Sequence, residues 1–163
     1  MMPPSHNRKT KQGYYKIINL HKYTGNPANC VYRSSWERKF MLWCDLSPGI
    51  VKWCSEPLRI GYVDFFGKKR SYIPDFIIET VNTTDPNKEA NNRFLVEIKP
   101  SHETVEPIIP KGYISPKQLK NLEYACAVWQ KNKHKWAYAL QWCKKHDIVF
   151  KIVTEVQINK LKA

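Results

Sequence analysis

Two short apolar segments carry acidic and basic side chains in a pattern suited to metal chemistry. Residues 72–78 contain Asp75, and residues 94–99 contain Glu97 and Lys99. Segments rich in Ile, Val and Phe, separated by polar residues, are typical of two strands of one sheet. Because strand side chains alternate between faces, Glu97 and Lys99 share one face and the apolar residues fill the other. A carboxylate at Asp75 beside that polar face is costly to bury unless it is paired or bound to a cation.

Two carboxylates a few ångströms apart offer the oxygen ligands that Mg²⁺ accepts. Such a metal polarises a phosphoryl oxygen and helps to form hydroxide from water. A lysine beside it orients the water or stabilises charge that grows on the phosphate. Asp75, Glu97 and Lys99 therefore fit metal-dependent phosphodiester hydrolysis. The alternative is a surface hairpin with a Glu–Lys pair on its solvent face, because both patterns are common.

The composition favours a polyanionic partner. The chain has 163 residues, a net charge of +13 and a pI near 9.6, with 42% hydrophobic residues. We therefore expect a globular protein whose field attracts nucleic acid, with a basic structural protein as the alternative. No apolar run is long enough to span a membrane, and the first residues lack the apolar core of a signal peptide, so we expect neither. No small-molecule substrate is indicated.

The chain divides into an arm and one domain. Residues 1–16 contain four basic residues and no acid, which favours a flexible basic arm; binding to DNA or to a capsid partner is the alternative. Residues 17–163 have the size of a single domain. The cysteines form no Cys-x-x-Cys pair, so we expect reduced, apolar side chains rather than a zinc site. These are Cys30, Cys44, Cys54, Cys126 and Cys143.

The order of elements predicts an α/β (mixed α+β) fold with a central mixed sheet flanked by helices. A capping box formed by Ser34 and Glu37 begins the first helix, and residues 47–49 end it. A second capping signal stands at Ser115, and a third at Thr154. The strand at 148–153 is nearly all apolar, which indicates burial on both faces. The other expected elements are strands at 51–53, 58–66 (followed by a turn at 67–69), 71–78 and 94–99, loops at 82–93 and 100–116, and a separate helix at 133–146.

Basic residues gather at the turn near Lys69 and along the C-terminal helices, where they would contact the phosphate backbone of DNA. A solvated turn and a solvated helix surface are the alternatives. No motif for base-specific readout is present. The expected contact residues are Arg33, Lys69, Arg70, Lys117 and Lys120, with Lys131, Lys133 and Lys135 on the same helical face.

The combination of Pro74-Asp75 with Glu97-Ile98-Lys99 resembles the signature of PD-(D/E)XK nucleases. Further segments, in their order and spacing, resemble the head completion nucleases of contractile-tailed phages, relatives of TnsA-like and restriction-type nucleases. This resemblance extends from about residue 23 to the C-terminus. The segments are Tyr32–Glu37, Trp53–Pro57, Arg70–Phe76 and Glu97–Pro100.

The resemblance implies a restriction-endonuclease-like core and a Mg²⁺- or Mn²⁺-dependent nuclease of double-stranded DNA. Asp75, Glu97 and the carbonyl of Ile98 would bind the metal, Lys99 would orient water or stabilise the phosphate, and Glu37 would complete the metal shell. Glu37 has a structural alternative, which is to cap its helix. Glu56 would support the site from behind or simply occupy a turn.

The same resemblance implies finishing of packaged DNA during head completion, so that a tail joins the head. The expected location is the host cytoplasm during assembly, with the virion as the alternative, and the expected protein partners are portal or neck proteins. The alternatives are a non-catalytic head–tail joining protein, a DNA-binding adaptor, and a TnsA-like transposition nuclease.

Overall fold

The computed structural model describes residues 12–81 and 92–162. The expected loop at 82–93 lies largely outside these residues, although its last two residues, Asn92 and Arg93, belong to a strand. No described helix is both long enough and apolar enough to cross a membrane. The strands are β1 (Gly13–Tyr14), β2 (Val31–Tyr32), β3 (Ile50–Ser55), β4 (Ile60–Val63), β5 (Lys69–Tyr72), β6 (Phe76–Thr80), β7 (Asn92–Ile98) and β8 (Val149–Val153). The helices are α1 (Ser35–Leu46), α2 (Pro116–Lys145) and α3 (Glu155–Lys160), with short 3-10 turns at Leu20–Lys22, Pro27–Asn29 and Ser101–Glu103.

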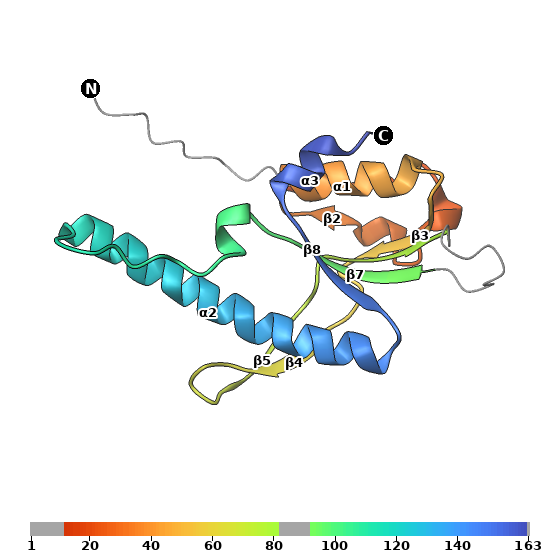
Figure 1. The fold of residues 1–163 in the computed structure, drawn as a ribbon. Coiled ribbons are helices and arrows are strands. Elements are labelled where there is room, and N and C mark those ends of the chain that lie inside the picture. The colour runs from red at the N-terminus through yellow and green to blue at the C-terminus, as the bar shows by residue number, and fades with distance from the viewer. Residues whose placement is uncertain (1–11, 82–91, 163) are drawn as a thin grey trace, which may run out of the picture.

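A four-stranded mixed sheet, ordered β3-β6-β7-β8, forms the centre of the fold. The pairs β3–β6 and β6–β7 are antiparallel, and β7–β8 is parallel because α2 connects these two strands. Helices α1 and α3 lie over one side of the sheet, while α2 and the β4–β5 hairpin lie on the other (Figure 1). This arrangement confirms the expected mixed sheet flanked by helices.

The alternation of side chains on β6 and β7 builds two separate cores. Phe76 and Val96 belong to the core under α1, together with Phe40, Met41 and Trp53. On the opposite face Leu95 packs in a second core with residues of α2 and of the β4–β5 hairpin. Since Glu97 lies two residues after Leu95, its side chain faces α2, as the period of two predicts.

The predicted strand at 71–78 is two strands in the structure, and its break positions the site. β5 pairs with β4 in a hairpin, whereas β6 pairs with β3 and β7. Pro74 lies between them, fully buried, and lacks the N–H needed to continue a ladder. The change of sheet places Asp75 directly before β6, at the end of the central sheet.

Three other predictions about elements need correction. The two helices expected at 115 and at 133–146 are one continuous helix, α2, because no Pro or Gly interrupts it. The apolar spacing in these two expected helices also predicts that Leu119 and Leu140 are buried, but both are exposed. β8 is an edge strand rather than a buried one, and Val149 in it is 50% exposed.

The expected arm boundary at residue 16 is wrong for residues 13–16. β1 pairs with β2, and Tyr15 is buried in the core under α1. The fully buried carboxylate of Asp45 on α1 holds this segment: its Oδ2 accepts hydrogen bonds from Tyr15 Oη (3.0 Å) and the Ile18 N–H (2.7 Å), and its Oδ1 accepts one from the Asn19 N–H (2.9 Å). Residues 1–11 lie outside the described residues.

We predict that Asp45→Ala lowers the free energy of unfolding by about 3 kcal/mol, because it leaves three donors of the N-terminal segment without their acceptor. The measurement is denaturant unfolding followed by circular dichroism. Glu123→Ala, at an exposed position of α2, is the control and changes stability little. Equal midpoints for the two variants would contradict this role of Asp45.

Candidate active site

The register of β6 and β7 brings Asp75 and Glu97 together. Phe76 pairs with Val96, so Asp75, the preceding residue, lies opposite Glu97, the following one. The backbone N–H of Ile98 donates a hydrogen bond of 2.6 Å to Asp75 Oδ2, which fixes the carboxylate against the end of β7. The two acids therefore lie next to each other, as the sequence pattern predicts.

Both carboxyl groups lie in a poorly solvated place. Glu97 is only 3% exposed and Asp75 is half-buried. Desolvation, and after it the charge of Glu97, raise the pKa of Asp75 well above its usual range. Desolvation also raises the pKa of Glu97, although Lys99 opposes this shift. Two adjacent carboxyls with raised pKa values indicate that the neighbouring cations do not fully neutralise the two negative charges.

Lys99 supplies part of the missing positive charge. Its Nζ lies 3.3 Å from Glu97 Oε1, and its side chain is mostly buried. Burial lowers the pKa of Lys99, but the charges of Glu97 and Asp75 outweigh that effect and raise it. The ammonium is therefore held charged beside the two acids, as the expected role requires.

The sequence predicts Lys135 on a DNA-binding helix face, and the structure brings it near enough to Glu97 for the two charges to interact. Desolvation lowers the pKa of Lys135, and the charge of Glu97 opposes that effect. Its Nζ lies 5.2 Å from the centre of the ring of Tyr72. No sequence signal near Lys135 indicated this role, since helix α2 is remote in sequence from both strands.

The residues present fit a divalent cation. Glu97 Oε2 is buried and has no hydrogen-bond partner, so one carboxylate oxygen beside Asp75 is free to act as a ligand. Carboxylate oxygens are the ligands that Mg²⁺ and Mn²⁺ accept. Among residues 12–81 and 92–162, however, no group of three or more His, Cys, Asp and Glu side chains lies close enough to hold a metal. Any remaining ligands would be main-chain oxygens or water.

Glu37 occupies the start of α1 in the manner of a helix cap. Its Oε2 accepts a hydrogen bond from the Arg33 N–H (2.7 Å), and its Oε1 accepts one from Ser34 Oγ (2.9 Å). Ser34 thus caps the helix as expected, but the capping box is incomplete, because Glu37 accepts from the Arg33 N–H rather than from the Ser34 N–H. Within the described residues the Glu37 carboxylate forms no cluster with the two acids. Its charge nevertheless contributes to the raised pKa values of Asp75 and Glu97.

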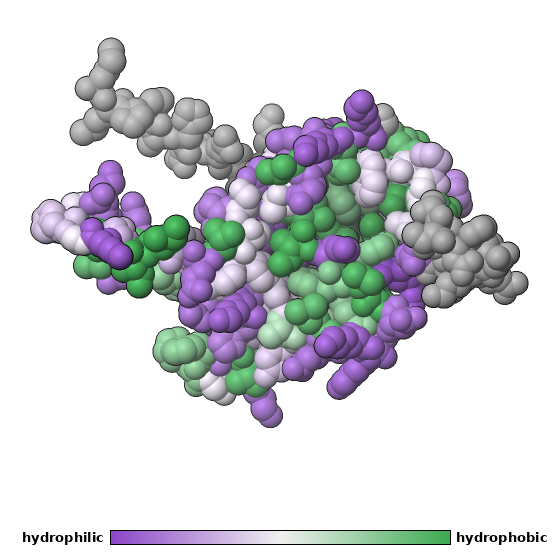
Figure 2. Space-filling model, in the orientation of Figure 1, coloured by the Kyte–Doolittle hydropathy of each residue, from purple (hydrophilic) through white to green (hydrophobic). Residues whose placement is uncertain are grey.

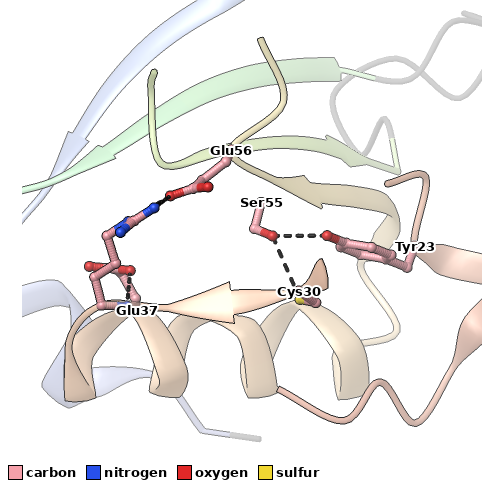
Figure 3. A network of polar contacts seen from close by, with 6 residues as sticks. Tyr23, Cys30, Glu37, Ser55 and Glu56 are labelled. Carbon is pink, nitrogen blue, oxygen red and sulfur yellow. Dashed lines mark hydrogen bonds and ion pairs between the residues drawn. The ribbon is translucent and has the colours of Figure 1, made fainter. Parts of the chain in front are cut away.

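Glu56 occupies the expected turn beside the site, which it contacts through its main chain rather than through its carboxylate. It turns the chain after β3 with a positive φ of 47°, and its N–H donates to the carbonyl of Asp75 (2.8 Å). Its carboxylate pairs with Arg33 at 2.7 Å, so Arg33 is not a free cation (Figure 3). Ser55, the last residue of β3, bonds to Tyr23 (2.9 Å) and contacts Cys30 (3.6 Å), a buried polar contact that fixes the end of this strand. The cysteines are free, as expected.

The expected DNA-contact residues occupy different places. Lys69 is exposed on β5, and Arg70 pairs with Asp64 at 3.0 Å. Lys117 and Lys120 are exposed in the first turns of α2. With about 3.6 residues per turn, the expected common face divides. Lys117, Lys120, Lys131 and Lys135 fall on one side of α2, and Lys133 falls on the opposite side.

The fold that brings these acids together is that of a nuclease family. Residues 47–155 match the family described as "TnsA-like endonuclease N terminal", which is two thirds of the chain. The chain therefore belongs to the TnsA-like endonuclease family, with a restriction-endonuclease-like fold, as its motifs predicted.

A curated relative extends the comparison beyond this domain. The "Head completion nuclease" of Enterobacteria phage T4 is 34% identical over 144 residues, which cover 88% of this chain and 90% of the relative. No solved structure matches. The resemblance to head completion nucleases, inferred from short motifs, is thereby confirmed over most of the chain.

We predict that Asp75→Asn stabilises the metal-free protein. A carboxyl whose folded-state pKa is raised contributes stability only at low pH, and this is lost as pH rises through the raised pKa. In EDTA the melting temperature of Asp75→Asn therefore exceeds that of the wild type by about 3 °C or more near pH 8, and the difference shrinks towards about pH 5. Asp147→Asn, at an exposed turn, is the control and shows no such trend. A wild type as stable as Asp75→Asn near pH 8 would contradict the raised pKa.

Proposed function

We propose that this protein is a Mg²⁺- or Mn²⁺-dependent deoxyribonuclease that cleaves double-stranded DNA during the completion of a phage head. The observation that carries the proposal is the unpartnered Glu97 Oε2, buried beside Asp75 at the end of two paired strands. Membership of the TnsA-like endonuclease family and similarity to a head completion nuclease support it.

Asp75 and Glu97 hold the cation in this proposal, with the carbonyl of Ile98 as a main-chain ligand. The metal, when bound, polarises the phosphoryl oxygen and lowers the pKa of water. The Ile98 N–H keeps Asp75 in place, so one oxygen of that carboxylate remains for the cation. Neutralisation of the two acids removes the repulsion that raises their pKa values, which provides a driving force for binding.

Lys99 and Lys135 stabilise the negative charge that grows on the phosphate during attack by water. Lys99 is held charged against Glu97 Oε1, and Lys135 approaches from α2 on the same face of the sheet. Preorganised cations in a poorly solvated site act strongly on a transition state. Hydrolysis adds water across one P–O bond and leaves a hydroxyl end and a phosphate end.

The biological setting follows from the relative rather than from the site. We propose that the enzyme acts in the host cytoplasm while heads are assembled, on packaged DNA, and that it contacts portal or neck proteins there. The basic surfaces of α2 and β5 would follow the phosphate backbone, which requires no base-specific contact.

We predict that the purified protein cleaves linear duplex DNA with Mg²⁺ or Mn²⁺, and that EDTA stops the reaction. Glu97→Gln and Lys99→Met lower the cleavage rate by about 100-fold or more, because they remove a metal ligand and a charge at the phosphate. Binding to DNA, measured by fluorescence anisotropy in EDTA, changes little.

Glu106→Gln and Lys111→Met, both at exposed loop positions, are the matched controls and cleave as the wild type does. A wild type that binds DNA and never cuts it would contradict the proposal and favour a non-catalytic joining protein. Equal activity of Glu97→Gln would show that cleavage uses a different site.

We include Glu37 in the catalytic set, and Glu37→Gln tests this assignment. The amide oxygen of Gln still accepts the hydrogen bond from the Arg33 N–H, and its NH2 group can donate to Ser34 Oγ, so we expect the melting temperature to change by about 1 °C or less. Cleavage falls about tenfold or more, because the negative charge near the acids is lost. A variant that is as active as the wild type would reduce Glu37 to a helix cap.

A further inference from the structure

The end of the β4–β5 hairpin exposes two aromatic rings that the proposed chemistry does not use. Phe66 is 88% exposed and Phe65 is 69% exposed. The strand expected to include them ends earlier, at Val63. In Figure 2 apolar side chains stand out at the end of this hairpin, beside polar side chains along α2.

The turn that carries these rings is firmly braced. Asp64 Oδ1 accepts hydrogen bonds from the N–H groups of Phe66 (3.0 Å) and Lys68 (2.9 Å), and Asp64 Oδ2 binds Arg70 (3.0 Å). These bonds, with the one from the Lys68 N–H first, lower the pKa of Asp64, so it stays ionised. Gly67 supplies the positive φ of 74° that closes the turn. A braced turn presents its aromatic rings with little loss of entropy on binding.

The two rings have different roles. Phe65 packs edge-on against His134 of α2, with ring centres 6.2 Å apart, and so joins the hairpin to the helix. Phe66 stands nearly perpendicular to Phe65, at an interplanar angle of 86°. Its high exposure leaves most of its surface open to solvent, so Phe66 is the ring available for stacking.

A cavity of about 690 Å³ lies between the hairpin and α2, a size typical of ligand sites. Phe65, Phe66, Arg70, Lys131 and Lys135 are among the residues that line it. Lys135 links the cavity to the acids, because it lines the cavity and its ammonium is near enough to Glu97 for the two charges to interact. A strand of nucleic acid in the cavity would therefore lead into the proposed active site.

Exposed aromatic rings next to lysine and arginine are the combination that binds single-stranded nucleic acid, in which bases are free to stack and phosphates need cations. In a duplex the faces of the bases are already covered by their neighbours. We propose that the hairpin and the cavity hold a single-stranded segment of the DNA substrate, with Phe66 stacked on an unpaired base and Lys131 near its phosphates. The preferred substrate is then duplex DNA joined to an unpaired strand, an inference that rests on the proposed nuclease function.

The test compares two fluorescent DNA probes in EDTA, where binding is measured without cleavage. One is a blunt hairpin duplex, and the other is the same duplex with a single-stranded tail. We expect the wild type to bind the tailed probe about tenfold more tightly than the blunt one. In Phe66→Ala this preference falls to about threefold or less, and Phe66→Trp retains it. Tyr113→Ala, which removes a ring that is 93% exposed elsewhere, is the control and keeps the preference.

A second readout detects stacking directly. The fluorescence of 2-aminopurine at the first unpaired position of the tail is quenched by the wild type and not by Phe66→Ala. Equal affinity for the two probes, or a preference unchanged in Phe66→Ala, would overturn the inference. If no DNA is cleaved with any metal while the Phe66-dependent preference persists, the nuclease function fails and the single-strand site stands.

Discussion

The central physical constraint in this structure is the repulsion between two adjacent, poorly solvated carboxylates that are not fully neutralised by nearby cations. Asp75 and Glu97 lie opposite each other at the end of β6 and β7, and Lys99 is in direct contact with Glu97. Both acids have raised pKa values because water is largely excluded and their charges repel. Such an arrangement opposes folding and is hard to explain as a structural device. A site that binds a cation and then a phosphate accounts for it.

The rest of the fold maintains this pair. Pro74 breaks the chain between two sheets and directs Asp75 into the central one. The continuous helix α2 spans the same face and carries Lys135 to the acids, while its middle forms one wall of the cavity beside the β4–β5 hairpin. On the opposite face the core under α1 packs against the outer strand β3, and Asp45 holds the N-terminal segment. The catalytic groups thus come from rigid strands, and the surfaces suited to DNA come from a helix and a hairpin.

Much of this arrangement followed from local patterns. Alternation fixed the faces of Glu97 and Lys99, and capping signals at Ser34, Ser115 and Thr154 marked three helix starts. The missed features depend on contacts between remote segments. No periodicity indicates that residues 71–78 change from one sheet to another, or that the charges of Lys135 and Glu97 interact. The exposed position of Phe66 was predictable from local sequence, because Asp64 and Gly67 occupy positions that a turn requires. The apolar residues at 58–66 instead indicated one continuous strand.

The most direct test of the central claim is the position of Mn²⁺ in a crystal of the protein, located by anomalous scattering. The account predicts a Mn²⁺ ion bound by the carboxylates of Asp75 and Glu97, with Glu97 Oε2 as one ligand, and no such ion in crystals of Asp75→Asn. An ion bound elsewhere, or an empty site at saturating Mn²⁺ with both carboxylates unchanged, would contradict it.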